Sequence, residues 1–200
     1  MGFTDNLKTL AQFRLSIIML LWLLGAVLAQ SPPRVVDLSF VPDKTLVNFT
    51  LGDVLHTVHG SFDVKRGAVH FDPATNQVSG EILVDATSGH SGSDMRDKKM
   101  HKEVLESGHF PEIVFRPDRV EGHVATEGSS TIQVHGTFAI HGAEHEISIP
   151  VVVEMAPGKW TATSHFAVPY VNWGMKNPST FVLRVNQSVD IDVRASGQIP

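Results

Sequence analysis

The stretch that decides the fold is "TIQVHGTFAIHGAEHEISIPVVVEM", residues Thr131–Met155. Apolar and polar residues alternate through both of its halves, which is the period-two pattern of a β-strand with one buried face. The apolar positions are Ile132, Val134, Phe138 and Ile140, and then Ile147, Ile149, Val151, Val153 and Met155. The residues between the halves, "HGAEH" at 141–145, are typical of a turn. The stretch therefore predicts an antiparallel hairpin.

The same alternation recurs along most of the chain. It is found at 57–64, 77–86, 161–170 and 189–195, with shorter candidates at 46–51, 112–118 and 181–185. Turn residues separate these runs at 65–67, 72–77 and 156–159. Eight or more strands in one domain close into a barrel or stack as a sandwich. Glycines on the inward faces, at Gly60, Gly80 and Gly136, favour strongly bent strands such as those of a barrel wall.

One segment breaks the alternation. "DMRDKKMHKEVLESGHFPEIVF", residues 94–115, is charged and begins with helical spacing. Asp94 is suited to cap a short helix at about 93–106. Met100, Val104 and Leu105 share one side of it, and Pro111 prevents its continuation. We expect this insert to lie across an open barrel end or along a seam. An ordinary connector with a solvated face is the alternative.

The N-terminus has the pattern of an export signal. Lys8 and Arg14 precede an unbroken apolar run, Ile17–Val27, and small residues follow at a cleavage position after Ala29. We therefore expect residues 1–29 to be a signal peptide, 30–34 a short linker and 35–200 one domain. An uncleaved N-terminal anchor is the alternative. Either way the domain is expected outside the cytoplasm.

Composition narrows the function classes. Without residues 1–29 the chain has 14 basic and 20 acidic residues, a formal charge of −6, which argues against a nucleic-acid partner. It has no cysteine, so thiol chemistry and thiolate metal sites are excluded. An exported domain without disulfides favours a bacterial periplasm. We expect no cofactor.

Five segments resemble the YceI-like family. They are "VNFTLGDVLHTVHGSFDVKRGAVHFDP" at 47–73, "GEILVDATS" at 80–88, "SDMRDKKMHKEVLESGHFPEIVF" at 93–115, "VHGTFAIHGAEHEISIPVVVE" at 134–154 and "HFAVPYVNWG" at 165–174. Their order and spacing cover about residues 35–193. The chain departs from the family at "KKMHKEVLESGHF", where the usual aromatic pair is reduced to Phe110. It also has Ala143 and Glu144 where a threonine is common.

The resemblance implies an all-β fold, an eight-stranded antiparallel lipocalin-like barrel. It also implies a binder or carrier of a polyisoprenoid or a similar amphiphile, such as an isoprenoid quinone, held inside that barrel. By alternation, the inward side chains expected to contact such a ligand are Phe62, Ile82, Val84, Phe115, Phe138, Ile140, Phe166 and Tyr170. Arg96 and Asp97 match the "RD" of the family. They are expected to fix the insert through an ion pair or hydrogen bonds, or else to steer a polar head group. A homodimer through the edge of the first and last strands stays open.

Two other function classes stay open as alternatives. Eleven histidines include His135, His141 and His145 around one turn, where imidazoles could bind zinc or copper at the outer surface. No spacing typical of a metal site accompanies them. A hydrolase or isomerase at the barrel mouth is the third class, but the chain has no nucleophile elbow, phosphate loop or dinucleotide motif. We therefore expect a binding protein and not an enzyme.

Overall fold

The structure is a computed structural model that describes residues 35–52, 57–180 and 184–199. These residues all belong to the compact unit Pro33–Pro200. The expected signal peptide and linker lie outside the described residues, as do the first three positions of the strand expected at 181–185. Of that strand, Arg184 is irregular and Val185 makes an isolated bridge. Among the described residues, no helix has the length and apolar character needed to span a membrane.

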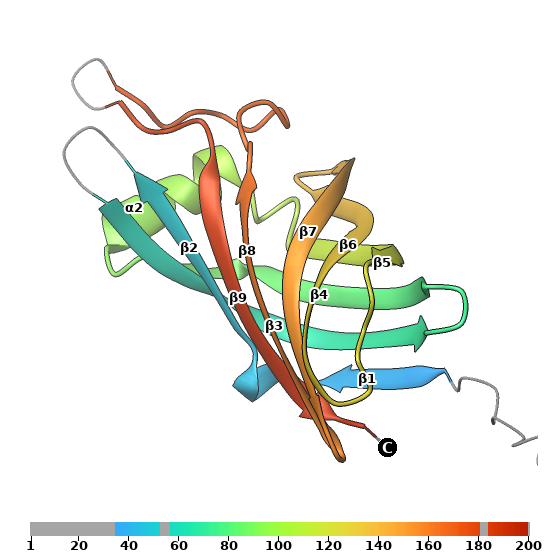
Figure 1. The fold of residues 1–200 in the computed structure, drawn as a ribbon. Helices are drawn as coiled ribbons and strands as arrows, with labels where there is room; N and C mark the ends of the chain where they lie inside the picture. The colour runs from blue at the N-terminus through green and yellow to red at the C-terminus, as the bar shows by residue number, and fades with distance from the viewer. Residues whose placement is uncertain (1–34, 53–56, 181–183, 200) are drawn as a thin grey trace, which may run out of the picture. The chain divides into compact units, whose positions relative to one another are not determined.

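Within the described residues, nine strands form one antiparallel sheet (Figure 1). They are β1 (Val36–Phe40), β2 (Leu46–Gly52), β3 (Thr57–Asp72), β4 (Gln77–His90), β5 (Glu112–Glu121), β6 (Gly128–Ile140), β7 (Ala143–Ala156), β8 (Lys159–Val168) and β9 (Val189–Gln198). A 3-10 turn, η1 (Pro42–Lys44), separates β1 from β2. The insert contains α2 (Asp94–Lys99), which continues as a π-helical turn, η2 (Met100–Val104).

Strands β2–β9 close into an eight-stranded barrel, because β3 pairs with both β2 and β4 while β2 pairs with β9. The predicted lipocalin-like barrel with a helical insert is thereby confirmed. Short β1 continues the position of β2 beyond η1, where it pairs with β3 and β9. The edge considered for a dimer is therefore occupied within the chain: Val47 lies opposite Val193, and Phe49 lies opposite Ile191.

The hairpin predicted from Thr131–Met155 is β6–β7. Its register runs without interruption from Gly128 opposite Met155 to Ile140 opposite Ala143. The two-residue loop is His141–Gly142, with φ of +52° and +75°. Two positive φ angles are the geometry of the tight turns that match strand twist, so the prediction is confirmed.

One stretch of the wall lacks a ladder. β7 pairs with β8 only over Val151–Ala156, and Pro150, which has no N–H to donate, stands where this pairing stops. In Figure 1 the two strands separate toward the end of the barrel near α2. Residues 143–149 of β7 therefore pair with β6 alone.

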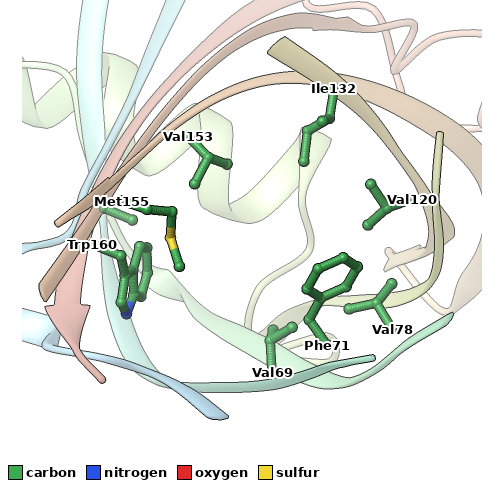
Figure 2. Close-up of a cluster of buried hydrophobic side chains, with 9 residues drawn as sticks. Val69, Phe71, Val78, Val120, Ile132, Val153, Met155 and Trp160 are labelled. Carbon is green, nitrogen blue, oxygen red and sulfur yellow. The ribbon is translucent and has the colours of Figure 1, made fainter. Parts of the chain in front are cut away.

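The barrel has two distinct ends. At one end, which we call the floor, buried side chains such as Phe71, Met155 and Trp160 form a cluster (Figure 2). At the other end, which we call the mouth, lie the insert 94–110 and the segments 169–180 and 184–187 (Figure 1). A second buried cluster lies below them and includes Leu105, Ile140, Tyr170 and Met175.

The insert lies at the barrel end, as predicted, but its helix is capped by a residue other than Asp94. Leu105 is buried, and Met100 and Val104 pack against the mouth cluster, as their spacing predicted. The N-cap is Ser93 and not Asp94, and its side chain makes no capping hydrogen bond. Asp94 lies in the first turn, where a carboxylate is favourable beside the free N–H groups. The capping prediction was therefore wrong by one residue.

Candidate functional site

The barrel encloses a cavity of about 490 Å³ that extends from the floor to the mouth. Its lining is almost entirely aliphatic and aromatic. Trp160, with 2% of its surface exposed, and Phe71 lie at the floor, and Met100 and Met175 lie at the mouth. Arg96 of the insert and Thr163 of β8 both line the cavity and are exposed, so the cavity reaches solvent beside the insert and along β8. A concave, mostly apolar cavity with few polar groups is the usual form of a ligand site.

All eight side chains predicted to face inward line this cavity. They come from five strands and the segment after β8: Phe62, Ile82, Val84, Phe115, Phe138, Ile140, Phe166 and Tyr170. Phe138 is central, because its ring centroid lies 6.4 Å from those of both Phe115 and Phe166. Their contact with a ligand stays a prediction.

The polar groups of the lining are largely satisfied by the backbone of the wall. The Tyr170 hydroxyl donates to the carbonyl of Asn186 at 2.7 Å, and the Ser164 hydroxyl donates to the carbonyl of Pro150 at 2.7 Å. Burial raises the pKa of Tyr170, so its phenol stays neutral. Thr45 likewise donates to the carbonyl of Val41 at 2.9 Å. The cavity therefore offers a ligand an apolar environment with few free hydrogen-bonding groups.

Arg96 and Asp97 converge on Ser91, at the start of the insert. Asp97 accepts hydrogen bonds from the Ser91 hydroxyl and, at 2.9 Å, from its backbone N–H. Arg96 donates to the Ser91 hydroxyl at 2.9 Å and to its carbonyl at 2.8 Å. Burial raises the pKa of Asp97, but the hydrogen bonds from Ser91 and the adjacent His90 outweigh it, and the net pKa is lowered. These contacts fit the expected structural role. Steering of a head group stays a prediction.

The fold and this site agree with a comparison of sequence families. The family model of the YceI-like domain matches residues 38–196. The chain belongs to the YceI-like family. No curated protein sequence matches it.

Solved structures share the barrel of this YceI-like chain at low sequence identity. BcnA of Burkholderia cenocepacia is similar with a TM-score of 0.65 and 17% identity, over 79% of this chain and 99% of that one. A polyisoprenoid binding domain from Saccharophagus degradans, implicated in plant cell wall breakdown, has a TM-score of 0.66 and 14% identity, over 82% and 98%. The YceI protein of Campylobacter jejuni has a TM-score of 0.60 and 15% identity, over 72% and 86%. Identities this low show the fold alone.

Several lining residues of the YceI-like barrel were not predicted. Phe49 and Leu51 of β2 line the cavity, and the alternation of 46–51 could have revealed them. Met175 and Pro178 come from a segment without strand periodicity, so no pattern pointed to them. Trp160 lies at the start of β8, beside a turn, where a sequence gives little indication of burial.

Ion pairs and hydrogen bonds hold the two parts of the mouth together. Lys176 pairs with Glu103 at 2.7 Å, and Lys99 donates to the carbonyl of Pro178 at 2.9 Å. The Lys176 ammonium lowers the pKa of Glu103, so this pair stays charged at neutral pH. Lys99 and Arg96 are the charged side chains of the cavity lining. No carboxylate lies within ion-pairing distance of either in the described part of the chain.

The histidines of the described residues are not grouped as the surface metal site considered as an alternative would require. Among the described residues, no three or more His, Asp or Glu side chains are grouped to hold a metal, and no histidine lines the cavity. His135 lies 2.8 Å from Asp118, and His141 lies 3.3 Å from Glu106. His145 was expected on the outer face, and that was wrong: its ring stacks on Trp173, and its Nε2 is buried. It shares the parity of Ile147 and Ile149 and therefore faces inward.

Proposed function

We propose that this YceI-like protein binds and carries a long apolar amphiphile, a polyisoprenoid or an isoprenoid quinone, inside its barrel. The observation that carries the proposal is the 490 Å³ cavity with its apolar lining. Cavities of this size hold small-molecule ligands in other proteins. An eight-stranded barrel has room for one such ligand when side chains do not fill it.

The energy of an empty cavity supports an occupant. The cavity reaches solvent, so without a ligand water contacts its apolar walls, and each Å² of apolar surface exposed to water costs about 25 cal/mol relative to burial. Water is a poor filling, because buried water needs two to four polar partners and the lining offers few. An apolar ligand removes this cost.

The family supports a lipid as the ligand class. One structure of the same fold is described as a polyisoprenoid binding domain. At 14% identity, this similarity indicates a shared fold but not shared ligand contacts. The choice of an isoprenoid over another apolar chain therefore rests on the family, and the apolar character of the ligand rests on the cavity.

We also propose that the protein acts in the periplasm after export. The support is the pattern of residues 1–29 together with the absence of cysteine. Cell fractionation with N-terminal sequencing tests this proposal. A mature N-terminus at Gln30 in the periplasmic fraction supports it. A protein retained in the cytoplasm with Met1 intact contradicts it.

We propose binding without a chemical reaction. The histidine–carboxylate pairs of the described residues, such as His165 with Asp192 at 2.9 Å, lie away from the cavity lining. An acid–base pair must reach the substrate to act on it. Unchanged ligand mass after prolonged incubation is the expected result.

A titration with a long-chain isoprenoid quinone tests the binding function. Binding is followed through quenching of Trp160 and Trp173 in the mature protein. Ala162 lines the cavity, whereas its neighbour Thr161 is exposed on the other face of β8. Ala162→Phe fills the cavity and is expected to weaken binding by about tenfold or more, while Thr161→Phe leaves it unchanged. Equal affinity of both variants, with native circular dichroism, would place the ligand outside the barrel.

A further inference from the structure

The charges of the described chain are segregated along the barrel. The mouth segments 94–110, 169–180 and 184–187 contain six basic residues against four acidic ones. The remaining described residues contain seven basic residues against fifteen acidic ones. A protein with a formal charge of −5 thus has a locally positive mouth, at the end where its cavity reaches solvent.

The positive charge is concentrated on one side of the insert. Lys98 and Lys99 follow Met95 at spacings of three and four residues within α2, which brings them to one face. Lys102 belongs to the π-helical turn η2 and lines the same shallow surface hollow as Lys98. Lys98 and Lys102 are exposed, and neither makes an ion pair or hydrogen bond in the described part of the chain. Both ammonium groups are therefore accessible to a partner, although the charge of Lys102 contributes to lowering the pKa of the adjacent Glu103.

An exposed apolar side chain lies within this basic face. Met95 is 82% exposed, the most exposed large hydrophobic side chain of the described residues. Met100 of the same insert, by contrast, packs against the mouth cluster. A basic helix face with an exposed apolar residue is the composition of segments that bind at membrane surfaces.

The insert also has four acidic residues, and they differ in their surroundings. Asp94 is exposed one helical turn before Lys98, and the exposed Glu106 lies 3.3 Å from His141. Asp97 is turned toward Ser91, and Glu103 is neutralised by Lys176. On the nearby wall, Glu144 lies 3.5 Å from Arg116. Strands of 14 residues such as β4 extend about 45 Å, whereas charges are screened over about 8–10 Å at physiological salt. Acidic residues near the floor, such as Asp72 and Glu154, therefore contribute little to the field at a surface facing the mouth, whereas the exposed Glu112 at the start of β5 lies next to the insert.

We propose that the face formed by Met95, Lys98, Lys99 and Lys102 docks on a membrane that contains anionic lipids, with the mouth of the barrel toward the bilayer. The exposed Lys98 and Lys102 bind lipid phosphates, and Met95 enters the interfacial region. This orientation brings the opening beside Arg96 to the surface from which an apolar ligand leaves or enters. The docking rests on the charge and exposure of the insert and not on the identity of the ligand.

Sedimentation with vesicles tests the proposal on the mature protein without added ligand. One set of vesicles contains phosphatidylcholine alone, and the other contains equal parts of phosphatidylcholine and phosphatidylglycerol. We expect binding to the anionic vesicles only, and its loss at high salt. The double variant Lys98→Glu/Lys102→Glu is expected to bind at least ~10-fold more weakly, since each basic residue near an anionic surface contributes about fivefold in affinity.

The matched control reverses the charge of two lysines at the floor. Lys44 in η1 and Lys159 at the start of β8 are exposed, so Lys44→Glu/Lys159→Glu makes the same change in net charge at the opposite end. This control is expected to bind as the unaltered protein does. Equal loss in both double variants, equal binding to both kinds of vesicle, or no vesicle binding at all would overturn the proposal. The last result would leave an acidic protein as the partner of this face. A quinone titration of the same variants measures ligand binding independently of docking. Lys98 and Lys102 do not line the cavity, so these variants are expected to bind the quinone as the unaltered protein does.

Discussion

The indole of Trp173 lies flat on the imidazole of His145, with ring centroids 4.2 Å apart and planes only 2° apart. Trp173 follows β8 in the chain, whereas His145 belongs to the part of β7 that has no ladder with β8. Trp173 also contacts Phe138, with ring centroids 5.6 Å apart. Ring contacts thus connect the segment after β8 to the wall at a place where backbone hydrogen bonds do not.

This stack predicts a difference between two substitutions of His145. The Nε2 atom is buried without a hydrogen-bond partner among the described residues, which is unfavourable. His145→Phe keeps a ring against Trp173 and removes that atom, so its free energy of unfolding is expected to be unchanged or higher. His145→Ala removes the ring and is expected to lower it by about 1–2 kcal/mol. Urea unfolding measures both, and His165→Ala at an exposed outer position is the control. If His145→Ala were more stable than His145→Phe, the stacked rings would not stabilise the fold.

The contacts of Asp97 predict that the free energy of unfolding depends on pH. The pKa of Asp97 in the folded protein is lowered from its ordinary value of 3.8. The ionised carboxylate therefore stabilises the folded protein fully above pH 3.8, and this contribution is lost as the pH falls through the lower pKa of the folded state. At neutral pH, Asp97→Asn is expected to lower the free energy of unfolding by about 1–3 kcal/mol. The difference from the unaltered protein should shrink as the pH falls below about 4.

The control for Asp97 is three residues away. Asp94 is exposed in the same helix, and Asp94→Asn is expected to change stability by less than about 0.5 kcal/mol. Thermal unfolding of the three proteins at several pH values supplies the comparison. A constant effect of Asp97→Asn down to strongly acidic pH would show that its charge is not what stabilises the insert.

Close approach of two strands predicts the effect of a methyl group at Gly136. A Cβ there would lie 2.4 Å from the carbonyl oxygen of Arg116 and 2.7 Å from the Cα of Pro117, both of which are backbone atoms. Gly136→Ala is expected to cost about 2 kcal/mol or more. Gly108→Ala has nothing within 4 Å of the new atom and serves as the control. Equal melting temperatures of the two variants would show that β5 can move away at little cost.

Most of the barrel could be predicted from the alternation of apolar residues. Inward residues such as Phe138 and Phe166 were identified because a period of two assigns each strand residue to one face. The same rule applied to His145 gives the inward face, and the error arose because the neighbouring turn was treated as the outer surface. Closure, however, depends on pairing between β2 and β9, which are far apart in sequence, and no local pattern reports it.

The mouth was the least predictable part of the site. The contact of Lys99 with Pro178 joins residues 79 positions apart in the chain, and the segment around Trp173 and Met175 has neither helical nor strand periodicity. Such segments take their conformation from what they pack against. The helix of the insert was foreseen, but its cap was assigned to Asp94 because capping geometry depends on backbone angles that a sequence does not reveal.

Native mass spectrometry of the mature protein, purified from the periplasm of its host without added lipid, tests the central claim most directly. We expect a bound species of isoprenoid mass in one-to-one ratio, recovered by organic extraction and absent from Ala162→Phe. A protein that is empty as isolated, and stays empty after incubation with polyprenyl lipids and quinones while remaining folded, would contradict it.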